Sequence, residues 1–547
     1  MRGKGGKYLT TSLLLFSSII IACIVCNKIF SKLGIPMLLA FILLGMFFGS
    51  DGVVKIAFDD YSAAEQISSV ALIFIMFYGG FGTKWKSAKK VAAKSILLST
   101  AGVVLTAGLT GLFCHYVLHI TLLESFLIGA VISSTDAASV FSILRSKHLN
   151  LKYNTAPMLE VESGSNDPCA YMLTVIILTI MGGNISGVEI VKTIFSQVFF
   201  GVLLGIGIAL VTIEILKKFR FTGAGFDDVF VLAVAVLSYA LPMAIGGNGY
   251  LSTYICGVIL GNSKIKKKIS LVHFFDGITG LMQMLLFFLL GLLSFPSQFP
   301  KVVLPALLIS IFLTFIARPA AVFLILSPFR SKLNQQILVS WSGLRGAASI
   351  VFATMAMISP INVEIDIFNI TFMIVLFSIL LQGSLIPLAA KKLDMIDNDA
   401  DVMKTFTDYV DEVPVRFIQF RIVEEHPWSE QAVKDILLPP DTILVLLLRM
   451  KEKIVPNGNT VLLPGDILIL SAKAPGKIEG VSLTEKQIEK GDGWEGKTIS
   501  RLPKEETADM LIIMIKRDDK TIIPNGDTIL RENDVLVINY IGETEDE

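Results

Sequence analysis

The sequence predicts a polytopic α-helical membrane protein that continues into a soluble, β-rich α+β tail. The 547 residues are 53% hydrophobic and only 17% charged, and their mean hydropathy is +0.69, far from the composition of a soluble domain. The net charge of zero hides an asymmetry. Residues 1–393 hold 29 Lys and Arg against 16 Asp and Glu, a net charge of +13, whereas residues 394–547 hold 18 against 31, a net charge of −13.

The apolar runs end where the charge balance changes. We therefore expect a transmembrane domain at 1–393, an acidic linker at 394–413, and two soluble domains at 414–475 and 476–547. The five cysteines all lie in apolar stretches, so we expect neither a disulfide framework nor a Cys-based metal or redox site.

About thirteen stretches approach the roughly 20 apolar residues that a helix needs to cross a bilayer. Several are short or interrupted by Gly and Pro, as occurs where transporter helices unwind around a site. The thirteen candidates are 8–26, 34–50, 65–82, 93–117, 122–144, 156–181, 190–216, 229–245, 249–262, 271–293, 302–327, 337–358 and 367–390.

Lys and Arg collect in alternate loops, for example at 84–94 and 264–268, while the intervening loops hold only Lys55, Lys192 and Lys301. By the positive-inside rule the basic loops are cytoplasmic. This places the N-terminus outside and the tail inside the cell.

Charged side chains within apolar helices are costly and each needs a physical reason. The clear cases are Asp136, Glu160, Glu162, Asp167, Arg318 and Arg345. The segment SSTDAAS (133–139) around Asp136 is poor in helix formers, so we expect the helix to break there and expose backbone groups beside the carboxylate.

A second polar group lies in ESGSNDP (162–168). Ser163, Asn166 and Asp167 are spaced i, i+3, i+4 and share one face of a helix, and Pro168 loosens the local hydrogen bonding. Carboxylate, amide and hydroxyl oxygens are ligands that a hard cation such as Na⁺ or K⁺ accepts. The alternative is a buried polar network that only locks helices together, with Arg345 available as a partner for a carboxylate.

With SWSGLRGAASIVFA (340–353) as a third motif, residues 1–393 resemble the bacterial sodium or potassium/proton antiporters of the cation–proton antiporter superfamily. The NhaP-like branch with Asn-Asp in its sixth helix is the closer match. The resemblance implies inverted repeats, two broken helices that cross in mid-membrane, a homodimer, and a bacterial plasma membrane location.

The resemblance also implies roles for single residues. Asp167 is then the carboxylate shared in turn by cation and proton, and Asp136, Thr135, Ser163 and Asn166 complete the site. Glu162 and Arg345 are then a structural ion pair. Arg318 is unassigned: it could reach the membrane surface, pair with Glu160, or line the cytoplasmic entrance.

The tail contains an internal repeat. The stretch from Trp428 with Pro456-Asn457-Gly458 recurs from Trp494 with PNG at 524–526, and each copy is predicted to form strands separated by turns. Each copy resembles the C-terminal ligand-sensing subdomain (RCK_C, or TrkA-C) of regulators of potassium conductance. The resemblance implies dimerisation and a small ligand, with cyclic di-AMP the first to test; a packing module without ligand is the alternative.

Taken together, these features predict a K⁺/H⁺ antiporter that works by alternating access, serves K⁺ and pH homeostasis, and needs no cofactor or nucleic acid. A single carboxylate beside Asn166 suggests one proton per cation, hence electroneutral exchange. A Na⁺/H⁺ antiporter of the same mechanism is the alternative, because both ions take the same oxygens. A ligand-gated cation channel lacks a recognisable filter loop here, and an intramembrane enzyme lacks HExxH or GxSxG.

Overall fold

We describe the protein from a computed structural model in which the chain forms two compact units, Met1–Asp411 and Glu412–Glu547. Most of the predicted linker at 394–413 and the start of the first predicted helix lie outside the described residues. These are 14, 17–26, 28, 37–136, 139–140, 143–144, 149–183, 186–219, 225–265, 268–361, 363–397, 415–439, 442–449, 452–473, 482–488, 492–503, 510–517, 520–522 and 524–540.

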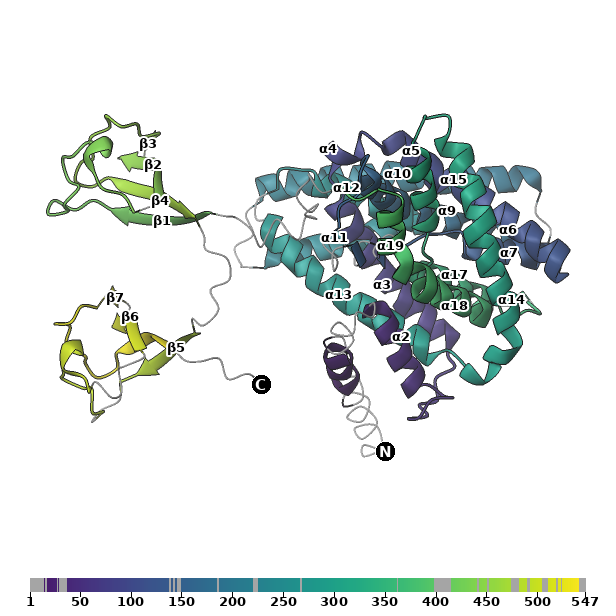
Figure 1. Ribbon diagram of the computed structural model, residues 1–547, viewed down its shortest axis with the longest axis horizontal. Coiled ribbons are helices and arrows are strands. Elements are labelled where there is room, and N and C mark those ends of the chain that lie inside the picture. Colours follow the sequence, from purple (N-terminus) through teal and green to yellow (C-terminus); the bar gives the residue numbers. More distant parts are fainter. Residues whose placement is uncertain are drawn as a thin grey trace. The chain divides into compact units, whose positions relative to one another are not determined.

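Among the described residues, the regular elements of the first unit are all helices, with one isolated bridge between Leu151 and Ile396 (Figure 1). After Ser17–Cys26 come α2 (Met37–Phe48), α3 (Tyr61–Gly82), α4 (Trp85–Ala88), α5 (Ala92–Leu97), η1 (Leu98–Gly102), α6 (Val103–Leu118), α7 (Leu122–Val131), α9 (Thr155–Met181), α10 (Gly187–Lys218), α11 (Phe226–Ala244), α12 (Gly249–Gly261), α13 (Lys268–Leu292), η2 (Pro296–Gln298), α14 (Phe299–Phe312), η3 (Leu313–Ala317), α15 (Arg318–Leu326), α16 (Leu333–Trp341), α17 (Ala347–Ile358), α18 (Ile367–Phe377), η4 (Ser378–Gly383) and α19 (Ser384–Lys392).

Seven helices among the described residues are long and apolar enough to cross a membrane. They are Tyr61–Gly82, Ala92–Leu118, Gly187–Lys218, Phe226–Ala244, Lys268–Leu292, Pro296–Leu326 and Ile367–Lys392. Five shorter apolar helices accompany them: Ser17–Cys26, Met37–Phe48, Leu122–Val131, Gly249–Gly261 and Ala347–Ile358. The multi-pass membrane fold is thereby confirmed, whereas the count of thirteen crossings stays a prediction.

Small residues let the helices approach closely. A Cβ on Gly257 of α12 would lie 2.3 Å from the carbonyl oxygen of Phe77 on α3, and a Cβ on Gly80 would lie 2.4 Å from that of Tyr254. Only glycine fits at both positions, as is common where membrane helices pack without a hydrophobic driving force between them. This contact fixes α12 beside α3 and next to α9, which carries the candidate site.

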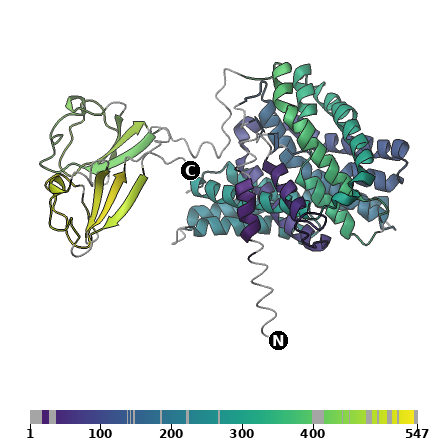
Figure 2. The same cartoon turned by 60° about the horizontal axis from the view of Figure 1, so that its bottom comes forward.

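The tail contains two four-stranded antiparallel sheets of the same topology (Figure 2). The first has the order β1-β4-β2-β3 and the second the order β5-β8-β6-β7. The strands are β1 (Val415–Arg421), β2 (Thr442–Arg449), β3 (Glu452–Ile454), β4 (Ile467–Lys473), β5 (Ser482–Gln487), β6 (Met510–Arg517), β7 (Lys520–Ile522) and β8 (Val535–Tyr540). In the described part of the tail, helix is limited to the short 3₁₀ turns η5 (Val433–Asp435) and η6 (Ile499–Arg501), so the predicted units are more purely β than expected.

Each copy is closed by one Asp–Arg pair in which the carboxylate is buried and the guanidinium is partly exposed. Arg449 Nε and a terminal guanidinium nitrogen donate to the two carboxylate oxygens of Asp466 over 2.8 and 2.7 Å. In the second copy Arg517 makes the same fork to Asp534, over 2.7 and 2.6 Å. Burial alone would raise the pKa of Asp534, but hydrogen bonds from Arg517 and from the backbone N–H of Arg531 hold that pKa below its usual value.

Candidate functional site

Two helices are interrupted, and the interruptions contact each other. Helix α7 ends at Val131 and residues 133–136 are non-helical, while α16 ends at Trp341 and α17 starts only at Ala347. The backbone N–H of Asp136 in the first gap donates to the carbonyl oxygen of Leu344 in the second over 2.7 Å. The two unwound segments therefore leave backbone groups free to act as ligands or as supports for side chains.

Arg345 anchors the first gap from the second. Its side chain is 1% exposed, and one guanidinium nitrogen donates to the carbonyl oxygens of Ser133 and Ser134, both over 2.8 Å. These carbonyls follow the C-terminal end of α7, where unpaired acceptors and the negative end of the helix dipole favour a cation. The hydrogen bonds of the Arg345 side chain thus go to a helix end rather than to a carboxylate, although Glu162 also acts on its charge.

Asp136 lies close to a helix end of the opposite kind, the N-terminal end of α17. Its carboxylate accepts a hydrogen bond from Ser139 Oγ over 2.6 Å. A Cβ on Gly346, the residue before α17, would lie 2.4 Å from Cβ of Asp136. The carboxylate is therefore close to the positive end of α17, which favours a negative charge.

Helix α9 presents the predicted polar face to residues 133–136. Ser163 Oγ donates to the carbonyl oxygen of Thr135 over 2.9 Å. Asn166 Nδ2 donates to Thr135 Oγ1 over 2.6 Å and to its carbonyl oxygen over 3.3 Å. The structure therefore brings Ser163 and Asn166 of α9 into contact with Thr135.

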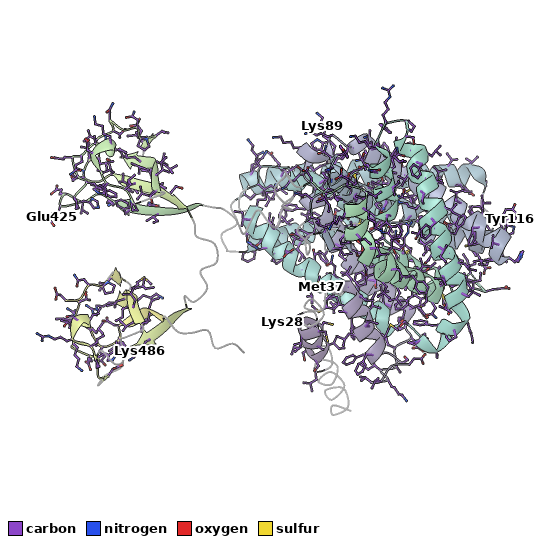
Figure 3. All side chains as sticks on the ribbon, viewed as in Figure 1. Lys28, Met37, Lys89, Tyr116, Glu425 and Lys486 are labelled. Carbon is purple, nitrogen blue, oxygen red and sulfur yellow. The ribbon has the colours of Figure 1, made fainter. Side chains whose placement is uncertain are left out.

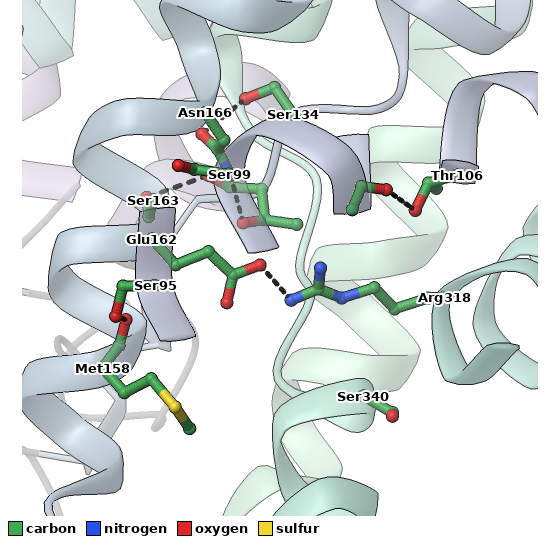
Figure 4. Close-up of polar contacts among 12 residues, drawn as sticks. Ser95, Ser99, Thr106, Ser134, Met158, Glu162, Ser163, Asn166, Arg318 and Ser340 are labelled. Atoms are coloured by element: carbon green, nitrogen blue, oxygen red, sulfur yellow. Dashed lines mark hydrogen bonds and ion pairs between the residues drawn. The ribbon is translucent and has the colours of Figure 1, made fainter. Parts of the chain in front are cut away.

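Ser134 is a contact that the sequence analysis missed. Ser134 is 2% exposed, and its hydroxyl donates to Oδ1 of Asp167. The same hydroxyl lies 3.3 Å from Oδ1 of Asn166 (Figure 4). Ser134 precedes Thr135 in the segment that was predicted to unwind, and that position was the available signal. Carboxylate, amide and hydroxyl oxygens converge at this point, which is the ligand set of a hard monovalent cation.

The predicted ion pair between Glu162 and Arg345 is wrong. Glu162 pairs with Arg318 of α15 instead, and the two side chains are 1% and 3% exposed (Figure 4). Arg318 has room because the facing residue is Gly343, where a Cβ would lie 2.8 Å from Arg318 Nε. Arg345 donates to the carbonyls at the end of α7 and not to Glu162, whose ion pair is with the other buried arginine.

This pairing also answers the question left open for Arg318. Arg318 neither reaches the membrane surface nor pairs with Glu160, a half-buried residue two positions before Glu162 on α9. It forms a buried ion pair with Glu162. One oxygen of Glu162, its Oε2, and Nε of Arg318 have no hydrogen-bond partner among the described residues. The pair is therefore single-bonded rather than a two-pronged fork.

The charged side chains of the site are of two kinds: those that face an opposite charge or helix end, and one that does not. Glu162 is neutralised by Arg318, and Asp136 and Arg345 each face a helix end of opposite sign. Among the described residues, the polar partner of the Asp167 carboxylate is a hydroxyl, and no Lys or Arg lies within ion-pair distance of it. Asp167 is thus a carboxylate without a fixed cation.

Interrupted helices around such a carboxylate define a class of protein, the ion-coupled membrane transporters. The comparisons with known proteins give the family. The model of the family "Sodium/hydrogen exchanger, transmembrane" matches residues 17–392, and that of the TrkA-C domain matches residues 417–476 and 483–540. The chain belongs to the sodium/hydrogen exchanger family and carries two TrkA-C domains.

Individual relatives agree with this assignment. The chain is 32% identical over 451 residues to the K(+)/H(+) antiporter NhaP2 of Shewanella sp. (strain MR-4), covering 81% of this chain and 78% of the relative. It is 32% identical over 468 residues to the K(+)/H(+) antiporter NhaP of Alkalimonas amylolytica, covering 85% and 81%. The structure of the sodium proton antiporter MjNhaP1 from Methanocaldococcus jannaschii superposes with a TM-score of 0.62 at 24% identity, over 70% of this chain and 99% of that one, which shows the fold.

The predicted resemblance is therefore confirmed. The protein is a cation/proton antiporter, a secondary transporter rather than an enzyme.

Proposed function

We propose that this antiporter exchanges K⁺ for H⁺ by alternating access and that Asp167 is the group that holds either ion. One observation carries the proposal: among the described residues Asp167 meets a hydroxyl, whereas Glu162 has a buried arginine beside it. A carboxylate with a fixed guanidinium partner has little to gain from a proton or an alkali cation. A carboxylate without one can take up either, but not both together.

The cation would be held by oxygens that already lie close together. Asp167 contributes a carboxylate, Asn166 its Oδ1, and Ser134 its hydroxyl. Thr135 and Ser163 support them, because Thr135 orients the amide of Asn166 and Ser163 ties the Thr135 carbonyl to α9. Asp136 would contribute its charge from the start of α17, beside Gly346.

Exchange follows from the cost of moving an empty site. With a proton or a cation bound, Asp167 is neutral and can pass between the two faces, whereas the ionised carboxylate alone is expensive to carry through a low-dielectric barrier. Of the three direct ligands, Asp167 is the carboxylate and its neighbour Asn166 is a neutral amide, which supports one proton per cation and electroneutral exchange. A transport rate that rises steeply with membrane potential would contradict this stoichiometry.

The choice of K⁺ is supported by the names of the two relatives, both K(+)/H(+) antiporters, and by the two TrkA-C domains. Na⁺ is the competing ion, because the same oxygens accept it.

For the membrane arrangement we propose thirteen crossings with the N-terminus outside and the tail in the cytoplasm of a bacterium. The seven long and five shorter apolar helices support this count, together with α9, whose three acidic residues set it apart from ordinary membrane spans. The alternation of basic loops supports the orientation. We also propose that the two unwound segments cross in mid-membrane as parts of inverted repeats.

For the tail we propose that the two TrkA-C domains contribute to a homodimer and bind a small regulatory ligand, with cyclic di-AMP as the first probe. Calorimetric titration of the full-length protein with cyclic di-AMP should show saturable binding. The exchange rate measured in vesicles should change when the ligand is present. Absence of binding would leave the domains as packing modules.

The exchange proposal is tested in sealed vesicles with an acid interior and a pH dye. Addition of K⁺ should alkalinise the interior for the wild type and not for Asp167→Asn. Asp59→Asn, which changes an exposed carboxylate ahead of α3, is the matched control and should behave as the wild type. A response to Na⁺ alone would keep the site and replace the ion, and an active Asp167→Asn variant would refute the site.

A further inference from the structure

A cavity of about 670 Å³ lies behind the helix that carries the candidate site. On α9 it is lined by Val161, Ser165, Pro168, Cys169 and Met172, which fall on one face of the helix. At 100° per residue this face points away from Asn166 and Asp167. The cavity is thus separate from the site that binds the transported ions.

The other walls of the cavity are formed largely by α10 and α12. Val202 and Ile206 of α10 and Leu251 and Ile255 of α12 line the far side. The lining is mostly apolar, with Ser, Thr, Asn and Tyr side chains at a minority of positions, so the space suits a flexible hydrocarbon rather than a polar metabolite. Its volume lies within the range of about 300–1,000 Å³ that is usual for small-molecule sites.

One end of the cavity is basic. Trp85 and Ala88 of α4 line it, and the same short segment carries Lys84, Lys86, Lys89 and Lys90. Lys86, Lys89 and Lys90 are exposed, and Figure 3 shows Lys89 at this end of the helices. Trp85 is itself 48% exposed, as tryptophans are where helices leave the apolar layer. An apolar cavity next to a group of lysines is complementary to a phospholipid, whose fatty acyl chains are attached to a phosphate.

We propose that this cavity binds one anionic phospholipid, with acyl chain carbon between α9, α10 and α12 and the phosphate on the lysines around α4. Charge complementarity selects the anionic headgroup: the lysines attract a net negative lipid and gain nothing from a zwitterionic one. The lipid fills the space behind the site-bearing helix, so its release or binding changes how closely α9 approaches α10 and α12. Cation exchange is then expected to depend on anionic lipid.

The test uses the full-length protein in phosphatidylcholine vesicles that contain a small fraction of phosphatidylglycerol with brominated acyl chains. Bromine quenches nearby tryptophan fluorescence, and the chain has four tryptophans. The difference between the wild type and Trp85→Phe isolates the signal of Trp85. We expect brominated phosphatidylglycerol to quench that signal, the same fraction of brominated phosphatidylcholine to quench it much less, and unbrominated phosphatidylglycerol to compete.

Two pairs of matched variants locate the lipid. Val202→Phe fills the cavity and should abolish the selective quenching, whereas Leu203→Phe, at a neighbouring residue that is 51% exposed and does not line the cavity, should keep it. Lys89→Gln with Lys90→Gln should weaken lipid binding about fivefold or more per charge. Lys391→Gln with Lys392→Gln removes two exposed charges at the end of α19 and should not.

Equal quenching by the two brominated lipids would overturn the proposal, as would unchanged selectivity in a folded Val202→Phe protein. If Val202→Phe does not fold, the two lysine pairs decide: equal effects of both pairs would overturn the proposal. Displacement by glycerol phosphate alone would also contradict it, because that probe has the headgroup and lacks the chains.

Discussion

Replacement of Glu162 by Gln tests which arginine is its partner. In the structure Glu162 and Arg318 are 1% and 3% exposed and bonded to each other, while Arg345 is bonded to carbonyls. Glu162→Gln would leave the charge of Arg318 buried without a counter-charge. Arg318→Met would do the same to Glu162, and the double variant would remove both charges.

The expected magnitudes follow from burial. Breaking a buried pair by removing one partner costs about 3–5 kcal/mol, whereas replacing both charges by neutral groups of similar volume is often close to neutral. Because one oxygen of Glu162 and Nε of Arg318 already lack partners, we expect each single change near the lower end, about 3 kcal/mol. The double variant should then recover most of that loss, which gives a coupling energy of about 3 kcal/mol.

The assay is a double-mutant cycle on the free energy of unfolding in mixed detergent micelles, followed by tryptophan fluorescence. A second cycle pairs Glu162→Gln with Arg345→Met, and its coupling should be below about 1 kcal/mol. Additive effects in the first cycle together with strong coupling in the second would refute the pairing described here and restore the pair that the family resemblance implied.

Three further predictions concern the unwound segments and the tail. Gly346→Ala should lower exchange and cost about 1–3 kcal/mol of stability, because its Cβ would lie 2.4 Å from Cβ of Asp136; transport and unfolding assays measure both. Ser134→Ala should raise the KM for the cation about tenfold without unfolding the protein, since it removes the hydroxyl that reaches Asp167. Asp534→Asn should destabilise the tail by about 1.5–3 kcal/mol at neutral pH, measured by fluorescence of the full-length protein. The pKa of the Asp534 carboxyl is lower in the folded protein than in the unfolded chain, where it is about 4. Its contribution to the free energy of unfolding is therefore present above pH ~4 and is lost as pH falls through the folded pKa. The wild-type tail should weaken only in strong acid.

The two variants of the helical unit each have a control in the chain. Gly280→Ala on α13 has open space around its Cβ and should leave exchange unchanged. Ser133→Ala removes a hydroxyl that donates to the Ala130 carbonyl at the end of α7, not to the site, and should leave the KM unchanged. An equal effect of either control would mean that the measured loss does not come from the contact named. For the tail, a stability that already declines near pH 6 would contradict the lowered pKa.

The polar face of α9 and the interruption at residues 133–136 could be predicted from the residues themselves because they depend on local chemistry, whereas the interruption between α16 and α17 was expected only from the family resemblance. Ser163, Asn166 and Asp167 follow helical spacing, and the stretch Ser-Ser-Thr-Asp is poor in helix formers. These features need no knowledge of which helices are neighbours. The repeat in the tail was visible for the same reason, since each copy carries its own turn and strand pattern.

The partner of Glu162 could not be predicted from the sequence. Arg318 and Arg345 are both single arginines in apolar helices, and nothing in the spacing says which one lies opposite α9. Gly343 decides it, by leaving room for Arg318, and a glycine's role in a contact depends on the facing helix. The hydroxyl of Ser134 was missed because its direction depends on the exact path of the unwound backbone.

The measurement that tests the central claim most directly is proton release on cation binding. Purified protein in weakly buffered detergent solution is titrated with K⁺ while a pH dye records released protons and calorimetry records binding. The account predicts about one proton released per K⁺ bound near the pH at which the site is half-protonated, and neither binding nor release for Asp167→Asn. Potassium bound without proton release, or release unchanged in Asp167→Asn, would contradict a single carboxylate shared in turn by the two ions.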